Sequence, residues 1–114
     1  MATFAFVAPL LPGKAETDRE GMQRLSTGEE KEAYEASRRA LGFKREAVWH
    51  QETPDGTLAI VVWEADDIAA AFGGIATSDE PFDRQFREFL QDVHGLDVAN
   101  DPPPDVQQII DHRF

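Results

Sequence analysis

The side chains with the widest chemical range in this chain are its three histidines, His50, His94 and His112. No two of them have an H-x-H or H-x-x-x-H spacing, and there is no cysteine to complete a zinc site. His94 and His112 each have an aspartate close by in sequence. We expect all three histidines to be solvated side chains at the surface. The position of His94 at the end of a predicted helix needs no functional explanation, since the helix dipole favours a protonated imidazole there. The sequence predicts no metal site and no cofactor.

A second candidate group combines a cation with two indole rings. Arg45 and Trp49 share one face of a predicted strand, and its hairpin partner could bring Trp63 beside them. Such a group could hold an anionic aromatic ligand by charge and stacking. The alternative is a solvated arginine above tryptophans that serve the core or a subunit contact, where tryptophan is common.

Aromatic side chains on predicted helices form the third candidate group. Phe82, Phe86 and Phe89 recur at helical spacing and could line an apolar pocket, although we expect them to pack the helix on the sheet. The hydroxyl of Tyr34 could act on a ligand, or simply reach solvent from a half-buried ring. Either Arg45 or His50 could polarise a bound molecule. The predicted ligand-binding residues are Tyr34, Arg45, Trp49, His50, Trp63, Phe86 and Phe89.

Sequence motifs for other chemistries are missing. Gly73-Gly74 has neither a following lysine nor a G-x-G-x-x-G frame, so no phosphate-binding loop is predicted. There is no G-x-S-x-G motif for a nucleophilic serine. The acidic pairs stand at predicted helix N-termini, where the helix dipole accounts for them. No catalytic residue is predicted.

The composition describes an acidic chain with enough apolar residues for a core. Its 114 residues include 22 acidic and 11 basic side chains, a formal charge of −11, and 41% are hydrophobic. Such a surface repels phosphate backbones and anionic lipids, so we expect no nucleic-acid or membrane partner. No stretch approaches the roughly 20 apolar residues of a membrane span, and the N-terminus lacks the basic region of a signal peptide. With no cysteine, these features favour a cytoplasmic protein.

Apolar periodicity and turn residues predict one domain over residues 1–114. Pro54-Asp55-Gly56 indicates a hairpin turn, and three successive prolines favour an extended connector over 97–105. The expected elements, in chain order, are a strand over 3–10, helices over 14–26 and 27–41, strands over 43–52 and 57–64, helices over 68–72 and 81–94, and a last strand over 106–114.

Two of these strands carry apolar side chains on both faces. Strand 57–64 has no polar face, which is typical of a central strand, whereas strand 43–52 is mixed and is expected nearer an edge. The order of elements is the ferredoxin-like βαββαβ pattern, an α+β fold with helices on one face of an antiparallel sheet. We expect Val61 and Trp63 on the bare face. That face would be too apolar for a monomer, so we predict a homodimer through it.

With this element order and second apolar face, the chain resembles the dimeric α/β-barrel superfamily, which includes antibiotic-biosynthesis-monooxygenase-like proteins and several uncharacterised bacterial families. The resemblance covers most of the chain and is carried by Pro12-Gly13-Lys14, the paired strands 43–52 and 57–64, and the aromatic helix. It implies two sheets packed face to face, with a small organic substrate or haem between sheet and helices in some members. No catalytic residue is transferred from it.

Two functions follow as hypotheses. The first is a non-catalytic module whose bare sheet face dimerises or binds another protein. The second is a cofactor-independent monooxygenase or isomerase, or a binding protein, for a small aromatic or polyketide-like molecule held between sheet and helices. An internal cavity of roughly a few hundred cubic ångströms, with a polar group facing it, would favour the second hypothesis.

Overall fold

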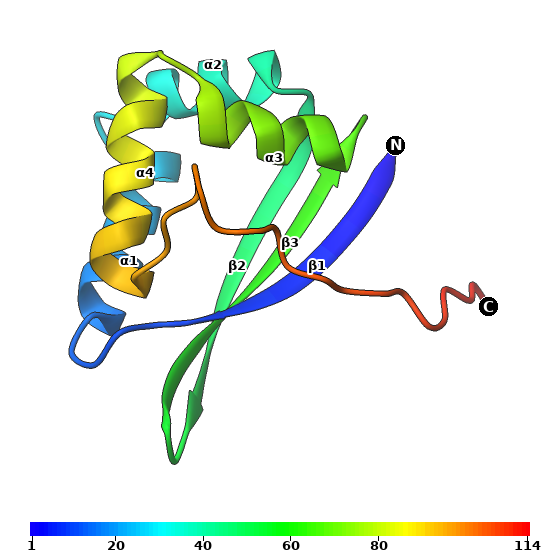
Figure 1. Cartoon of the computed structure of the whole chain (residues 1–114), viewed down its shortest axis with the longest axis horizontal. Coiled ribbons are helices and arrows are strands. Elements are labelled where there is room, and N and C mark those ends of the chain that lie inside the picture. Colours follow the sequence, from blue (N-terminus) through cyan, green and yellow to red (C-terminus); the bar gives the residue numbers. More distant parts are fainter.

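The computed structural model describes all 114 residues and has three strands and four helices (Figure 1). Every strand and helix predicted before residue 97 is present. In chain order the elements are β1 (Ala2–Pro9), α1 (Ala15–Thr27), α2 (Lys31–Ala40), β2 (Phe43–Thr53), β3 (Gly56–Ala65), α3 (Ile68–Thr77) and α4 (Pro81–His94). The fold is α+β, as predicted. None of the helices is long and apolar enough to cross a membrane.

The three strands form one antiparallel sheet in the order β1-β3-β2. The doubly apolar strand β3 is central and the mixed strand β2 lies at an edge, which confirms both predictions. The β2–β3 turn is stabilised locally, because the Thr53 hydroxyl accepts a hydrogen bond from the Asp55 amide over 3.2 Å. Gly56 follows with a φ of 130°, a value that other residues rarely adopt.

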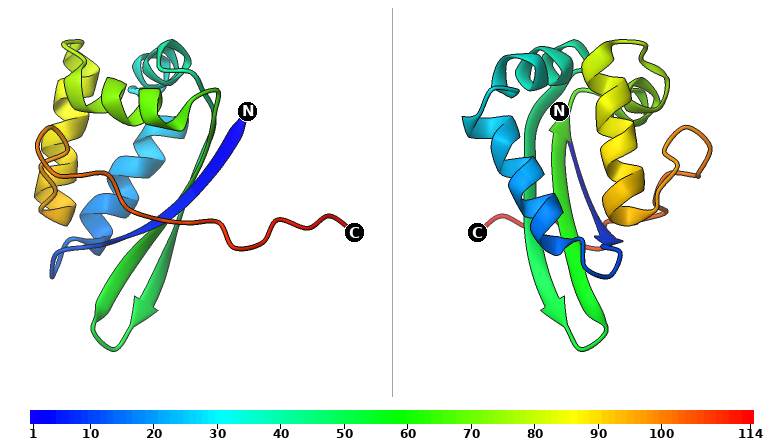
Figure 2. Two further views of the ribbon diagram at one scale, coloured as in Figure 1. Left: turned by 45° about the vertical axis from the view of Figure 1, so that its right-hand side comes forward. Right: turned by 90° about the vertical axis from the view of Figure 1, so that its left-hand side faces the viewer.

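All four helices lie on one side of the sheet (Figures 1 and 2). The strand register sorts the side chains of the covered face, called the inner face below, into three rows across the sheet. Each row contains one residue from β1, β3 and β2 in that order, namely Phe4–Trp63–Glu46, Phe6–Val61–Val48 and Ala8–Ala59–His50. The inner face therefore has bulky aromatic side chains at one end and two alanines at the other.

The opposite face of the sheet, called the outer face below, is covered by nothing in the chain. It holds the alternate residues of each strand, of which the apolar ones are Ala5, Val7, Leu58, Ile60, Val62, Ala47 and Trp49. Val7 and Trp49 are 52% and 50% exposed. The prediction of an apolar bare face is confirmed, but the residues expected on that face were wrong. Val61 and Trp63 face the helices, because their register partners are on the inner face.

Helix α3 is longer than the sequence indicated. Gly73-Gly74 was expected to end it, yet the helix continues to Thr77. A Cβ atom on Gly74 would lie 2.3 Å from Cδ2 of Leu41, so this glycine inside the helix allows α3 to pack closely against the end of α2. Of the two aspartates expected at the start of α3, Asp66 and Asp67, it is Asp67 that caps the helix, with its carboxylate accepting a hydrogen bond from the Ala70 amide over 3.1 Å.

The last twenty residues do not form the predicted strand. After α4 the chain makes a turn in which the Asp101 amide donates to the Asp97 carbonyl over 2.6 Å, and Pro102 to Pro104 follow. Residues 106–114 form no helix or strand and pair with no strand of the sheet. The predicted fourth strand is therefore not part of this domain, because the stiff proline segment leads the chain away from the sheet (Figure 1).

Candidate functional site

A cavity of about 770 Å³ lies between the inner face of the sheet and the helices. Of its 25 lining residues, 17 are hydrophobic. Ligand sites in proteins commonly have volumes of roughly 300–1,000 Å³ and mostly apolar walls with a few polar groups. The size and lining of this cavity are therefore those of a small-molecule site.

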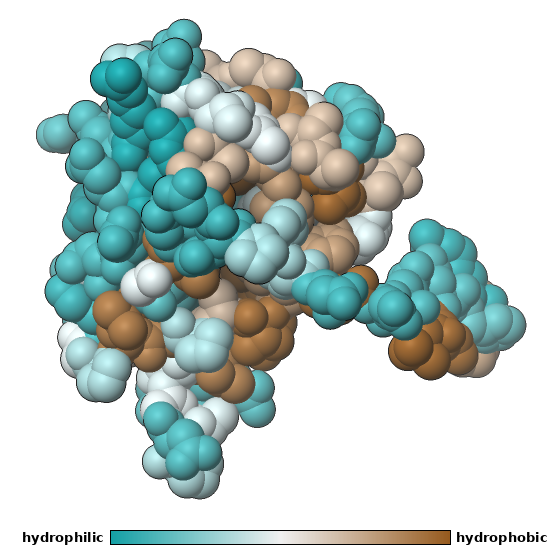
Figure 3. Space-filling view, in the orientation of Figure 1, coloured by the Kyte–Doolittle hydropathy of each residue, from teal (hydrophilic) through white to brown (hydrophobic).

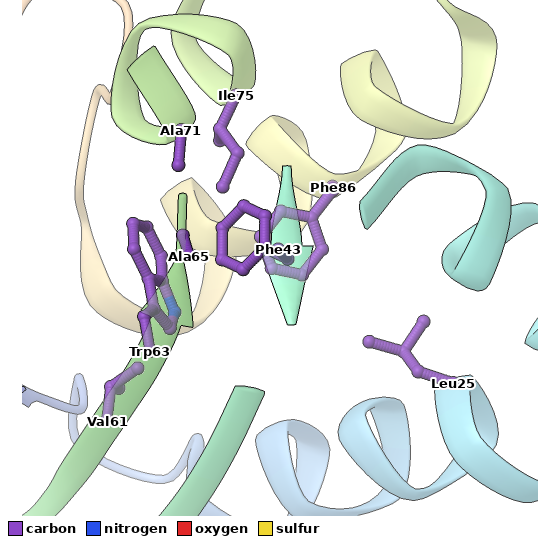
Figure 4. Packing of buried hydrophobic residues seen from close by; sticks show 8 residues of the cluster. All are labelled: Leu25, Phe43, Val61, Trp63, Ala65, Ala71, Ile75 and Phe86. Atoms are coloured by element: carbon purple, nitrogen blue, oxygen red, sulfur yellow. The ribbon is translucent and has the colours of Figure 1, made fainter. Parts of the chain in front are cut away.

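Aromatic rings form one end of the cavity. Trp63 is the centre of the group, with its ring centroid 4.4 Å from that of Phe72 and 5.4 Å from that of Phe6. Phe72 also meets Phe4 edge to face at 5.6 Å. Figure 4 shows Trp63 beside Phe43, with Ala71 and Ile75 of α3 above them. These contacts fix the rings on β1, β3 and α3, so this wall is rigid.

The carboxylate of Glu46 lies in the same row as Trp63 and accepts three hydrogen bonds. Its Oε1 receives one from the Tyr34 hydroxyl at 2.6 Å and one from Nε of Arg38 at 2.8 Å, and its Oε2 receives one from Nε1 of Trp63 at 3.1 Å. The side chains of Glu46 and Arg38 are each only 6% exposed. Both carboxylate oxygens are therefore occupied, and the charge of Glu46 is neutralised by Arg38.

Tyr34 is held as a hydrogen-bond donor by its surroundings. Burial, together with the negative charge of Glu46, raises the pKa of the Tyr34 hydroxyl well above its ordinary value. The guanidinium of Arg38 lies over the Phe86 ring, 4.4 Å from its centroid, and its Nη2 has no hydrogen-bond partner. Tyr34, Arg38, Glu46 and Trp63 thus form a buried network that organises the wall and presents no free charge.

A second polar pair stands at the alanine end of the inner face. Nε2 of His50 lies 2.6 Å from Oδ2 of Asp18, a residue of the first turn of α1. Asp18 lines the cavity and is the more deeply buried of the two, while His50 stands behind it on β2. This hydrogen bond is the single one made by the Asp18 side chain, so Oδ1 is free for a ligand. A carboxylate held by an imidazole beside a cavity can accept and return a proton.

His94 lines the same cavity from the end of α4. Its Nδ1 lies 2.9 Å from the carbonyl oxygen of Pro9. Because a carbonyl can only accept, Nδ1 carries the proton in this bond, and Nε2 of a neutral ring remains an acceptor. An ion pair of 2.9 Å between Lys14 and Asp92 joins α1 to α4 close by. The mouth of the cavity is completed by residues 98–104, of which Val98, Ala99, Asp101 and the three prolines contribute to the lining.

The charges around the cavity limit what it can hold. The carboxylates of Asp18 and Asp101 line it, that of Glu46 is neutralised by Arg38, and no lysine or arginine belongs to the lining. The remaining titratable group is His94, and the whole chain carries a formal charge of −11. A neutral or cationic molecule therefore meets a more favourable potential here than an anion does.

The structure brings some of the predicted ligand-binding residues together and separates others. Trp63 and Phe86 line the cavity, and Tyr34 and His50 contact it through Glu46 and Asp18. Phe89 packs instead against α1, where a Cβ atom on Gly21 would lie 2.5 Å from its ring.

Arg45 and Trp49 point to the outer face, so the predicted group of Arg45 with two indoles is wrong. The cause is the strand register. Trp63 is opposite Glu46, which places its side chain on the face away from Arg45 and Trp49. Arg45 pairs with Glu64 across the sheet at 3.3 Å instead.

Two polar residues of the site, Asp18 and Glu46, were missed from the sequence. The histidines were expected to be solvated, which is wrong for His50, largely buried against Asp18, and His94 lines the cavity. Asp18 belongs to the same helical stripe as Met22 and Leu25, and a carboxylate on an otherwise apolar stripe signals a buried polar group. Glu46 similarly alternates with Val48 and His50 on the inner side of β2. For His94, the sequence offers no comparable signal.

No group of three or more His, Cys, Asp and Glu side chains converges closely enough to hold a metal ion. Comparisons of the chain with protein-family models, curated proteins and solved structures found no match.

Proposed function

We propose that the protein binds a small, mostly apolar molecule, neutral or cationic, in the cavity between its sheet and its helices. The observation that carries this proposal is the cavity itself, with its aromatic end and the Asp18–His50 pair at the other end. A module that served only for dimerisation would need no interior space. The cavity therefore favours the second hypothesis, a binding protein or cofactor-independent enzyme for a small aromatic or polyketide-like molecule, over the first.

The chemistry best supported by the site is proton transfer within the bound molecule. In our proposal, Oδ1 of Asp18 removes a proton from the carbon that lies between a carbonyl group and a carbon–carbon double bond, and the electron pair is delocalised onto the carbonyl oxygen as a dienolate. Asp18 then returns the proton to the far end of that double bond, so the net reaction is a double-bond isomerisation with no co-reactant. The hydrogen bond to His50 keeps the carboxylate in place throughout.

Binding is tested with N-phenyl-1-naphthylamine, a neutral apolar dye that fluoresces in dry cavities. We expect saturable binding of one dye per chain. Ala8 lines the cavity, whereas Ala5 of the same strand points to the outer face, so Ala8→Leu and Ala5→Leu form a matched pair. Ala8→Leu should weaken binding at least about tenfold by occupying part of the cavity. Equal binding by wild type and Ala8→Leu, at unchanged folding, would argue against the cavity as the site.

We also propose that two copies of the chain pack through their outer faces, as in the dimeric α/β barrels that the sequence resembles. The supporting observation is the row of Val7, Ile60 and Trp49 across the uncovered face, of which Val7 and Trp49 are half exposed. Contiguous apolar surface of this kind is uncommon on monomers. A cytoplasmic location completes the proposal.

A further inference from the structure

The C-terminal segment is the most unusual part of the surface. We call residues 105–114 the arm. All ten are exposed, and the arm includes Ile109 and Ile110, which are 89% and 77% exposed, as well as Phe114. Three such large apolar side chains in one short segment are unfavourable in water, because the burial of apolar surface is the main favourable contribution to association. The arm therefore has the composition of a segment that is buried in the working protein.

The sequence of the arm would give a strand one mainly apolar side. In a strand conformation Val106, Ile110 and Phe114 would share one side with Gln108 and His112, and Ile109 would be the apolar residue of the other side. Its length exceeds that of an average strand of about five to six residues. Both outer strands of the sheet, β1 and β2, have one free edge that could accept it.

The preceding residues prevent the arm from returning to its own sheet. The turn at 97–101 is fixed by hydrogen bonds from the Asp97 amide to Asp101 and from the Asn100 side chain to Asp97. Pro102 to Pro104 then contribute to the cavity lining, so their position is set by the domain. A stretch of three prolines is stiff and extended. The arm consequently leaves the domain in a defined direction.

That direction is toward the side of the uncovered face. In Figure 1 the helices lie to the left of the sheet, and the arm runs past β1 and away to the right. The turned view of Figure 2 shows the same departure past β1. Figure 3 shows a hydrophobic patch on the arm, separated from the body of the domain. A second copy packed on the outer face would stand where the arm projects.

We infer that the arm is exchanged between two copies of this chain, and that each arm adds a fourth strand to a free edge of its partner's sheet. This inference rests on the proposed dimer and specifies its contacts. Exchange buries Ile109, Ile110 and Phe114, pairs a strand edge that is otherwise open, and supplies the fourth strand of the βαββαβ pattern from the other subunit. It also fixes both ends of the segment 98–104 at the cavity mouth, since that segment joins α4 to the arm.

Cross-linking tests the exchange directly. The chain has no cysteine, so Ile110→Cys provides a single site for a benzophenone maleimide label. Labelled protein of natural isotope content is mixed with ¹⁵N wild type, allowed to exchange subunits, and irradiated. We expect cross-linked peptides with one light and one heavy half, the heavy half coming from β1 or β2. Cross-links found only between two light halves of one chain would overturn the exchange.

A pair of variants gives a second, independent test. Ile109→Ser with Ile110→Ser removes the apolar groups of the arm, and Gln107→Ser with Gln108→Ser changes its polar residues at equal net charge. We expect the first pair to raise the dimer dissociation constant at least about tenfold in sedimentation equilibrium, and the second pair less than about threefold. Equal effects of the two pairs would count against an arm held by its isoleucines.

The tests separate failure of the exchange from failure of the dimer. Light scattering that reads a dimer, combined with cross-links within single chains, would leave the proposed dimer standing and remove the exchange. A monomer at micromolar concentration would remove both. Neither result bears on dye binding in the cavity.

Discussion

Replacing Glu46 by glutamine removes the negative charge that faces the buried guanidinium of Arg38 while keeping the shape of the side chain. In the native protein the carboxylate accepts from Arg38 at 2.8 Å, from Tyr34 at 2.6 Å and from Trp63 at 3.1 Å. Neither Nε of Arg38 nor Nε1 of Trp63 can accept a hydrogen bond. In either orientation of a glutamine side chain, its NH₂ group would therefore face one of these two donors, and the hydrogen bond at that position would be lost.

Removing one partner of a buried ion pair costs roughly 3–5 kcal/mol, because the other charge stays buried and uncompensated. Glutamine retains part of the hydrogen bonding, so we expect a loss of about 3 kcal/mol for Glu46→Gln. With a urea dependence of roughly 1–3 kcal/mol per molar, the unfolding midpoint should fall by roughly 1–3 M. Urea titration followed by far-ultraviolet circular dichroism measures this shift.

Glu64→Gln is the matched control. Glu64 pairs with Arg45 across the same two strands at 3.3 Å, but both side chains reach solvent, at 24% and 55% exposure. Exposed pairs contribute at most about 1 kcal/mol, so this variant should unfold within about 1 kcal/mol of wild type. A loss below about 1 kcal/mol for Glu46→Gln, or equal losses for both variants, would refute the account of Glu46 as a buried hub.

Two further predictions concern the same wall and its neighbour α3. Because the pKa of Tyr34 is raised in the folded protein, the folded chain keeps this proton at pH values above 10.0, where the unfolded chain loses it. The free energy of unfolding should therefore fall as the pH rises past 10. The slope contributed by this group should be at most about 1.4 kcal/mol per pH unit. Tyr34→Phe should remove that component in urea titrations between pH 9 and 11, and an unchanged slope would contradict the assignment. Gly73→Ala should stabilise the protein by up to about 1 kcal/mol, because nothing lies within 4 Å of its new Cβ atom, whereas Gly74→Ala should cost about 1–3 kcal/mol through its 2.3 Å approach to Leu41. Thermal unfolding of the two variants checks this order, and the reverse order would refute the packing argument.

The strands and helices before residue 97 could be predicted because local rules determine them. Apolar residues on both faces identified β3 as central, Pro54-Asp55-Gly56 located the hairpin, and apolar spacing located α4. The length of α3 could not be predicted, because Gly74 serves a contact with Leu41 that lies far away in sequence. The last strand was predicted from the apolar residues of 106–114, but a strand forms only where it can pair with the edge of a sheet. The prolines before the arm direct it away from the sheet of its own domain, so no such edge lies within its reach.

The site was predicted less well than the fold because it depends on register. Trp63 and Trp49 were assigned to one face, and a register known only from the structure places them on opposite faces. The Asp18–His50 pair joins two residues from different elements, and no local pattern reports such a contact. The alternation of Glu46, Val48 and His50 on one side of β2 was visible in the sequence, yet it was not read as a sign that this side faces a cavity.

The most direct test of the central claim is to locate a bound apolar molecule by nuclear magnetic resonance. Intermolecular Overhauser effects between N-phenyl-1-naphthylamine and the methyl groups of the ¹³C-labelled protein identify the face that it occupies. Binding in the cavity predicts contacts to the methyl groups of Val48 and Val61, which line it. Contacts to Val7 and Ile60 of the outer face, without contacts to Val48 and Val61, would contradict the proposed function.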